Sequence, residues 1–330
     1  METRRIYYRP IPLNTGGRWP LAGGPVGFSQ LERLERGRAP EICDQVPADI
    51  LETLTTARPP MMGMSFDRPR LMGIVNATPD SFSDGGSYDP IHQGNALIAA
   101  GADILDIGGE STRPGAQEIP VEDEIARVAP AIRELSARIP ISVDTRKSGV
   151  AAAALGAGAS MVNDVSGFDF DPVLASVISE SGCPVCLMHA QGRPETMQDD
   201  PRYDDVLLDV YDALEARLAR AEAAGIPRNR IFVDPGIGFG KTQDHNLALL
   251  RRISLFHGLG SPILLGLSRK RFIGAIGGAE RPADRMPGTL ALTLAAIAQG
   301  VQMHRVHDVA EIAQGLRLWQ AVGQNTEAET

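Results

Sequence analysis

Residues 71–86 read LMGIVNATPDSFSDGG, and the remainder of the chain repeats the pattern that this stretch introduces. The apolar run 71–75 predicts a buried parallel strand that ends at Asn76. The glycine-rich loop after it carries Asp80 and Asp84. Loops of this kind hold the functional groups of many α/β proteins, but Asp, Ser and Gly are also the residues of any solvated turn. This stretch alone leaves the two interpretations open.

Short apolar runs alternate with amphipathic segments along the rest of the chain. The runs predict strands at 71–76, 103–108, 140–144, 160–164, 184–189, 231–234, 262–267 and 301–307. Helical patterns lie at 95–100, 121–138, 147–155, 172–181, 203–224, 244–253, 288–299 and 308–322. A strand–helix unit repeated in this way predicts the α/β class and a (β/α)₈ TIM barrel. A doubly wound open sheet, which usually has fewer strands, is the structural alternative.

Residues 1–65 differ in character from this repeat, because they are punctuated by proline and glycine and offer helical patterns only at 29–35 and 48–55. We interpret 1–65 as an N-terminal extension of unknown role that packs on the main domain. The barrel is expected to span 66–323, and 324–330 is expected to be a disordered tail.

The composition excludes several classes of protein. A chain of 330 residues with 43% hydrophobic and 22% charged residues can bury a large core. Its net charge of −9 gives no basic footprint, so we expect no nucleic-acid partner. The 3 cysteines fit a reducing compartment rather than a disulfide framework. No apolar run is long enough to span a membrane, so we expect a cytoplasmic protein that binds no membrane.

The active site of a TIM barrel lies at the carboxyl ends of its strands. Each predicted strand here ends in polar or ionisable residues. They are Asn76, Glu110, Ser111, Thr112, Arg113, Asp144, Asn163, Asp164, His189, Asp234, Ser268, Lys270, Arg305 and His307. A single one of them is best explained as a helix cap. Because eight strand ends would converge on one mouth, the set as a whole favours a binding site.

Four of these residues form a chemically coherent group. Their carboxylates accept hydrogen bonds from N–H groups, the amide can donate and accept, and the ammonium donates. Such a set would complement a flat heterocycle with an amino-amidine edge and a carbonyl, such as a guanine or a pterin. The residues are Asp144, Asn163, Asp234 and Lys270. An Asp–Lys pair that serves stability alone is the weaker alternative, because buried ion pairs stabilise little.

A second group suits a phosphate or diphosphate. Arg305 and His307 are two positions apart on one predicted strand, so both side chains face the same way and can donate to an anion. Asn76 could hold Mg²⁺ across the mouth. The segment 234–242, DPGIGFGKT, resembles a phosphate loop, but Pro235 replaces its first glycine, and we therefore reject an NTPase.

Taken together, these residues resemble the dihydropteroate synthase family of pterin-binding enzymes. The motifs that carry the resemblance are NATPDSFSDGG, DIGGESTRPGA, SVDT, ND at 163–164, CLMHAQGRPETMQ, DPGIGFGK, GLSRKRFIG and RVHDV. The resemblance implies a (β/α)₈ barrel, usually a homodimer, and a Mg²⁺-dependent transferase of folate biosynthesis that sulfonamides target. It implies condensation of 4-aminobenzoate with 7,8-dihydropterin-6-ylmethyl diphosphate to 7,8-dihydropteroate and diphosphate.

The resemblance also implies roles for single residues. Asn76 would bind Mg²⁺, and Asp144, Lys270 and Arg305 would be catalytic. The loop closing over 4-aminobenzoate would contain 112–114. The implied substrate-binding residues are Thr112, Arg113, Pro114, Asp144, Asn163, Met188, Asp234, Phe239, Gly266, Ser268, Lys270, Arg271, Arg305 and His307. Arg271 stands where many relatives carry Ser, which leaves the contact to the aminobenzoate carboxylate open.

Two other functions compete with this one. A methyltetrahydrofolate–corrinoid methyltransferase would share the pterin pocket, but it would have no use for the TRPGA loop or the Arg-x-His pair. A non-catalytic pterin-binding paralogue is the other, and the intact Asn76, Asp144, Lys270 and Arg305 argue against it.

Overall fold

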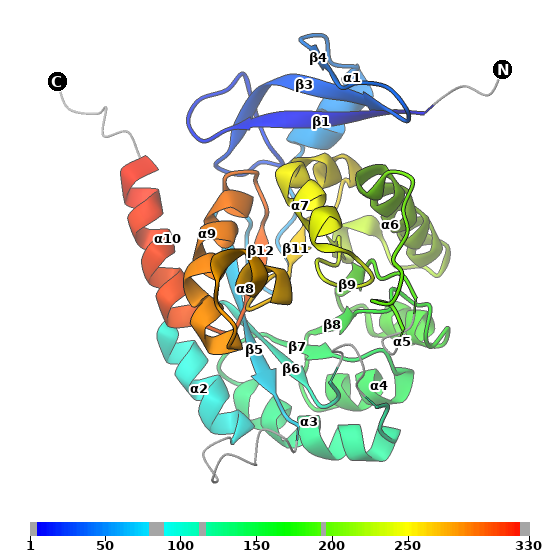
Figure 1. Ribbon diagram of the computed structural model, residues 1–330. Coiled ribbons are helices and arrows are strands. Elements are labelled where there is room, and N and C mark those ends of the chain that lie inside the picture. Colours follow the sequence, from blue (N-terminus) through cyan, green and yellow to red (C-terminus); the bar gives the residue numbers. More distant parts are fainter. Residues whose placement is uncertain (1–4, 79–88, 112–116, 193–195, 324–330) are drawn as a thin grey trace.

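The computed structural model of the chain describes residues 5–78, 89–111, 117–192 and 196–323 (Figure 1). Eight parallel strands form one sheet in the order β10-β9-β8-β7-β6-β5-β12-β11. They are β5 (Arg70–Asn76), β6 (Ile104–Gly108), β7 (Ile141–Asp144), β8 (Met161–Asp164), β9 (Val185–Met188), β10 (Ile231–Asp234), β11 (Leu264–Leu265) and β12 (Met303–Val306). A parallel bridge between Val233 and Ile263 joins the two outer strands and closes the barrel, which confirms the predicted fold.

All eight predicted strands are present, although the one predicted at 262–267 is reduced to two residues. Helices alternate with the strands, as predicted. They are α2 (Pro90–Ala100), α3 (Val121–Leu135), α4 (Ser148–Gly156), α5 (Leu174–Ser181), α6 (Val206–Ala223), α7 (Gln243–Arg251), α9 (Met286–Ile297) and α10 (Val309–Gly323). A further helix, α8 (Arg271–Gly277), and the 3₁₀ turns η2 (Arg228–Arg230), η3 (Ile253–Leu259) and η4 (Pro282–Arg285) were not predicted.

Helix α6 shows how sequence fixes these elements. The Asp205 side chain caps the helix by accepting hydrogen bonds from the Leu207 and Leu208 N–H groups, at 3.1 and 3.2 Å. Its apolar residues recur at helical spacing, and Leu214 and Leu218 are fully buried against the barrel. None of the described helices is long and apolar enough to cross a membrane.

The N-terminal region forms a small antiparallel layer. It contains β1 (Ile6–Leu13), β2 (Trp19–Pro20), β3 (Gly27–Glu35), β4 (Glu41–Cys43) and α1 (Ala48–Thr55). The helix predicted at 48–55 is confirmed, whereas the helix predicted at 29–35 is wrong because this segment is most of strand β3. Strand β3 buries Phe28 and Leu31 on the α1 side and Leu34 on the barrel side. With both faces covered it lacks the alternating pattern of a half-buried strand, which explains the error.

The N-terminal layer covers the amino end of the barrel, and β5 runs away from it (Figure 1). Arg58 Nη2 donates to the His257 carbonyl at 2.9 Å, and Ser254 Oγ donates to the Pro10 carbonyl at 2.9 Å. The segment 61–66 that enters the barrel plugs its interior at this end. The plug consists of Met61, Met64 and Phe66 against Met72, Ile104, Met161, Cys186, Phe232, Leu264 and Met303. Only the carboxyl end is therefore left for a site.

Candidate active site

The polar residues of the mouth follow from the alternation of side chains along each strand. Because a residue two positions after an inward-facing one also faces inward, each plug residue on a strand predicts the next interior residue. Six plug residues lead in this way to Asp106, Asn163, Met188, Asp234, Gly266 and Arg305. The apolar plug thus gives way, one layer further along the strands, to a mostly polar layer.

Arg305 lies at the centre of this layer, held between two carboxylates. Its Nε donates to Asp106 Oδ2 at 2.6 Å and its Nη2 donates to Asp144 Oδ2 at 2.8 Å. Asn163 Nδ2 donates to the same Asp106 oxygen at 3.0 Å. Asp106 is fully buried, and Asp144 and Asn163 are nearly so. The network therefore fixes the guanidinium plane in the mouth of the barrel.

The network leaves acceptor capacity unused. Asp106 Oδ1 and Asp144 Oδ1 are buried and have no hydrogen-bond partner within the described part of the chain. Burial raises the pKa of Asp144 to about 7, and the nearby Asp106 charge adds to this, whereas Arg305 opposes it. When Asp144 is ionised, above this pKa, two carboxylates face one guanidinium and leave an excess of negative charge. A ligand that brings N–H donors to this point would be stabilised.

Asp234 and Lys270 lie beside this network. Asp234 Oδ1 accepts a hydrogen bond from the Gly236 N–H at 2.7 Å. Burial raises the pKa of Asp234 to about 6, although that N–H and the Lys270 charge lower it. A side chain at Gly266 would lie 3.8 Å from Asp234 Oδ2 and 3.9 Å from Arg305 Cδ, so the two residues face the same small space.

Lys270 Nζ lies 4.0 Å from the centroid of the Phe239 ring, a cation–π arrangement. Gly238, with φ +83°, approaches the same lysine, since a side chain there would lie 3.3 Å from Lys270 Cδ. Met188 is almost fully buried at the end of β9. The structure therefore brings the Met188 thioether and the Lys270 ammonium, with the Phe239 ring against it, to the neighbourhood of Asp234.

Other predicted residues lie around this centre. The His307 N–H donates to Ser268 Oγ at 3.2 Å, and His307 Nδ1 lies 3.0 Å from the same oxygen. Asn76 is partly exposed at the end of β5, and Arg271 is exposed at the start of α8. The predicted residues Thr112, Arg113 and Pro114 lie outside the described residues.

The described residues contain no group of three or more His, Cys, Asp or Glu side chains suited to a metal. Asp106 and Asp144 already bind Arg305. Mg²⁺, however, commonly takes one or two protein ligands and completes its shell with phosphate oxygens and water. The carbonyl of the partly exposed Asn76 fits such a partial site.

The sequence-based prediction missed Asp106. Only the ends of the predicted strands were considered, and Asp106 lies within the segment 103–108. A signal was present, because Asp106 is a carboxylate among apolar residues and lies two positions after the plug residue Ile104. Sequence alone could have marked it as an interior charge that needs a partner.

Glu110, which was among the predicted strand ends, has a structural role instead. Lys147 Nζ donates to Glu110 Oε2 at 2.6 Å, to the Ile119 carbonyl at 2.6 Å and to Glu124 Oε2 at 2.9 Å. Although burial raises the pKa of Glu110, the bonds from Lys147 and from the Ile119 N–H lower it below its ordinary value. This network ties the two ends of the 110–119 loop together.

Comparison with known proteins identifies the family of the chain. A family described as pterin binding enzyme matches residues 72–307. The chain is 44% identical over 267 residues to the dihydropteroate synthase of Escherichia coli K12. The alignment covers 78% of this chain and 94% of that protein. It is 43% identical over 278 residues to the enzyme of Synechocystis, with 81% and 96% covered.

Solved structures give the same result. The dihydropteroate synthase of Xanthomonas albilineans with 4-aminobenzoic acid matches with a TM-score of 0.74 and 47% identity, over 78% of this chain and 94% of that one. The Yersinia pestis enzyme with a sulfonamide drug matches with a TM-score of 0.75 and 39% identity, over 80% and 98%. The chain therefore belongs to the pterin binding enzyme family and, within it, to the dihydropteroate synthases.

Proposed function

We propose that the mouth of this barrel condenses 4-aminobenzoate with 7,8-dihydropterin-6-ylmethyl diphosphate, giving 7,8-dihydropteroate and diphosphate. The observation that carries the proposal is that Asp234 and Arg305 face the same space beside Gly266, while Arg305 binds Asp144 directly and is linked to Asn163 through Asp106. These residues come from separate strands, and no packing requirement brings so many buried polar groups together. The Xanthomonas albilineans structure in complex with 7,8-dihydropteroate, 44% identical to this chain, supports the substrate assignment.

The pterin ring would lie against the acidic side of the mouth. The Asp234 carboxylate would accept the N–H groups of the amino-amidine edge, and Lys270 would donate to the ring carbonyl. Asn163 donates through Nδ2 to Asp106, and its Oδ1 would accept a hydrogen bond from the ring. Met188 and Phe239 would form the apolar walls. The ring would therefore be read at its polar edge and held by dispersion contacts on its faces.

The diphosphate would bind on the side of β12. Asp106 and Asp144 use Nε and Nη2 of Arg305, and its Nη1 carries two further N–H donors for the phosphate. Arg305 would also lie against the pterin face. His307, two positions further along, would donate to the same anion. Mg²⁺ bound by Asn76 and the phosphate oxygens would supply further positive charge to the leaving group.

In the proposed reaction, the bond between the pterin methylene carbon and the diphosphate oxygen breaks, and its electron pair leaves with the diphosphate. Donors from Arg305 and His307 stabilise the charge that develops there, which is where we expect most of the acceleration to arise. The electron-rich dihydropterin stabilises the methylene cation. The neutral amine of 4-aminobenzoate then attacks this carbon and loses its proton. No covalent protein nucleophile is required.

A coupled diphosphate-release assay with both substrates and Mg²⁺ tests this function. We expect one diphosphate for each dihydropteroate formed, no sustained release without 4-aminobenzoate, and loss of turnover in excess EDTA. Binding of dihydropterin diphosphate without turnover would favour the non-catalytic paralogue. Methyl transfer from methyltetrahydrofolate to a corrinoid, without diphosphate release, would favour the methyltransferase.

The remaining predictions belong to the same proposal. We propose a cytoplasmic homodimer, for which light scattering after gel filtration is the test, and the three free cysteines are compatible with a reducing compartment. The Yersinia pestis complex supports inhibition by sulfonamides. Thr112, Arg113 and Pro114 remain candidates for the 4-aminobenzoate loop, and Arg271 for its carboxylate. The division into extension (1–65), barrel (66–323) and tail (324–330) also stays a proposal, and the tail lies outside the described residues.

A further inference from the structure

The lysine of the segment that resembled a phosphate loop is buried rather than exposed to a ligand. Lys241 is 3% exposed. Its Nζ lies 2.8 Å from the Gly236 carbonyl oxygen, 3.0 Å from that of Phe239 and 3.3 Å from that of His189. It also lies 2.9 Å from His189 Nδ1. Among the described residues, no carboxylate forms an ion pair with it, so backbone carbonyls and one imidazole are what it binds.

These partners belong to two segments that pack backbone against backbone. Gly236 and Gly240 both have positive φ, at +66° and +61°. A side chain at Gly236 would lie 1.9 Å from the His189 carbonyl oxygen, and one at Gly240 would lie 2.4 Å from that of Gln191. The loop 234–241 therefore packs closely against the residues that follow β9. The Lys241 side chain lies between the two segments and hydrogen-bonds to both.

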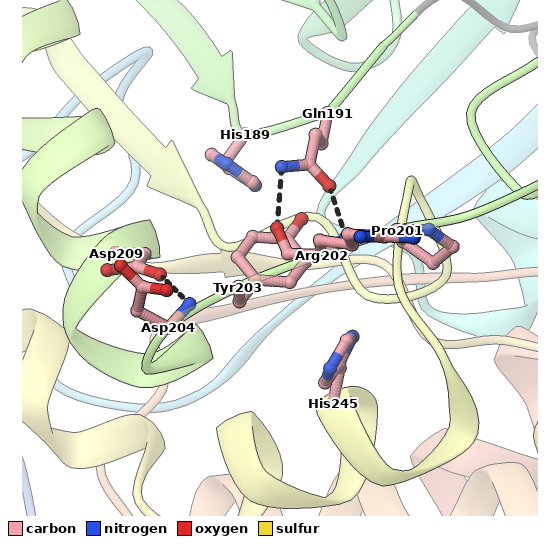
Figure 2. A pocket seen from close by; sticks show the side chains of 8 residues that line it. All are labelled: His189, Gln191, Pro201, Arg202, Tyr203, Asp204, Asp209 and His245. Carbon is pink, nitrogen blue, oxygen red and sulfur yellow. Dashed lines mark hydrogen bonds between the residues drawn. The ribbon is translucent and has the colours of Figure 1, made fainter.

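A layer of rings covers this junction. The Tyr203 ring lies between His189 and His245, with centroid separations of 6.1 and 5.0 Å, and Tyr203 Oη donates to the Gly240 carbonyl at 2.7 Å. These rings line a cavity of about 710 Å³, and Figure 2 shows the side chains around it. Gln191, which also lines the cavity, bonds at both ends of its amide to the Arg202 backbone. The Gln191 amide and the Tyr203 hydroxyl in the cavity wall thus hold the surrounding loops.

The loop held by Lys241 carries two parts of the proposed pterin pocket. The Gly236 N–H fixes Asp234 Oδ1, and the Phe239 ring lies over the Lys270 ammonium. The carbonyls of these same two residues, Gly236 and Phe239, accept hydrogen bonds from Lys241. The Lys241 amine therefore helps to set the positions of both the Asp234 carboxylate and the Phe239 ring.

We propose that Lys241 is a positioning residue for the pterin: it holds the Asp234 carboxylate and the Phe239 ring in place through the Gly236 and Phe239 carbonyls, without touching substrate. This inference rests on the proposed function, since the pocket that it shapes is the one assigned to the pterin ring. Among the described residues, the hydrogen-bond partners of Lys241 are His189 and two residues of the loop 234–241, which is assigned to the pterin. Loss of Lys241 should therefore weaken one substrate and leave the other unchanged.

Lys241→Met keeps an unbranched side chain that is one atom shorter and removes the hydrogen-bond donors. We expect the Kd for dihydropterin diphosphate, measured by calorimetry without 4-aminobenzoate, to rise at least 10-fold. The KM for 4-aminobenzoate at saturating pterin should stay within 2-fold. Lys241→Gln retains N–H donors and should recover part of the affinity, and it also tests the proposal if the methionine variant does not fold.

Arg58→Met is the matched control. Arg58 is another buried basic side chain that donates to carbonyls, those of Thr53, Thr56 and His257, but at the closed end of the barrel. We expect it to lower the thermal midpoint as Lys241→Met does, with the pterin Kd unchanged. A folded Lys241→Met protein with wild-type pterin affinity, or an equal loss for both substrates, would overturn the positioning role. Failure of the wild-type enzyme to release diphosphate would instead refute the proposed function.

Discussion

We expect Asp106→Asn to lower kcat/KM for dihydropterin diphosphate about 30-fold. Asp106 Oδ2 accepts hydrogen bonds from Arg305 and Asn163, and an asparagine oxygen could keep both at similar geometry. Hydrogen bonds to a charged partner contribute about 1.5–3 kcal/mol against about 1 kcal/mol for neutral ones, so each bond weakens by about 1 kcal/mol. The sum of about 2 kcal/mol corresponds to roughly 30-fold in rate.

The same substitution should move a pKa in a stated direction. The Asp106 charge helps to raise the pKa of Asp144, so its removal should lower that pKa from about 7. The acidic limb of the profile of kcat/KM against pH should therefore move to lower pH. The diphosphate-release assay, run from pH 5 to 9, measures both effects in one series.

Asp103→Asn provides the control for this experiment. Asp103 lies just before the same strand and also binds two arginines, Arg68 and Arg70, but at the amino end of the barrel. We expect its kcat/KM within 2-fold of wild type and its pH profile unchanged. An Asp106→Asn enzyme that behaved in the same way would refute the argument that Asp106 orients Arg305 for catalysis.

Four further predictions follow from the site and the fold. Lys270→Ala should reduce turnover about 100-fold, as expected for loss of one preorganised donor, and near-normal turnover in both this variant and Asp144→Ala would remove the assignment. Binding of a pterin without phosphate should weaken as pH falls below about 6, because protonation of Asp234 removes an acceptor, and calorimetry against pH measures this. The pKa values of Asp144 and Asp234 are raised on folding, so between about pH 4 and 7 the unfolded chain binds fewer protons than the folded one. These two residues should therefore lower the thermal midpoint as the pH rises through this range. A rise of the midpoint that is lost on replacing both residues by asparagine would contradict the assignment. Phe28→Ala should lower the free energy of unfolding by about 3–5 kcal/mol with kcat unchanged, since Phe28 is fully buried in the N-terminal layer, and urea titration checks it.

Much of the fold follows from local sequence. Each barrel strand, buried on both faces, reads as an apolar run, and each helix shows its own spacing, so the alternation predicts the barrel without reference to distant residues. Strand ends were predicted to within a few residues, as at β10, where the predicted and observed bounds coincide. Strand β3 was mistaken for a helix because its pairing with β1 and its burial on both sides come from other elements and are not visible in its own residue pattern.

The candidate site, too, could be predicted only in part from local sequence. The sequence by itself determined which polar groups stand at the carboxyl ends of the strands, because alternation along a strand is a local property. Only the tertiary structure decided which of them meet. Arg305 pairs with Asp106 across 199 positions, and closure of the barrel brings those strands to one rim. A buried charge takes its pKa and its orientation from such partners, and these are fixed only when the chain has folded.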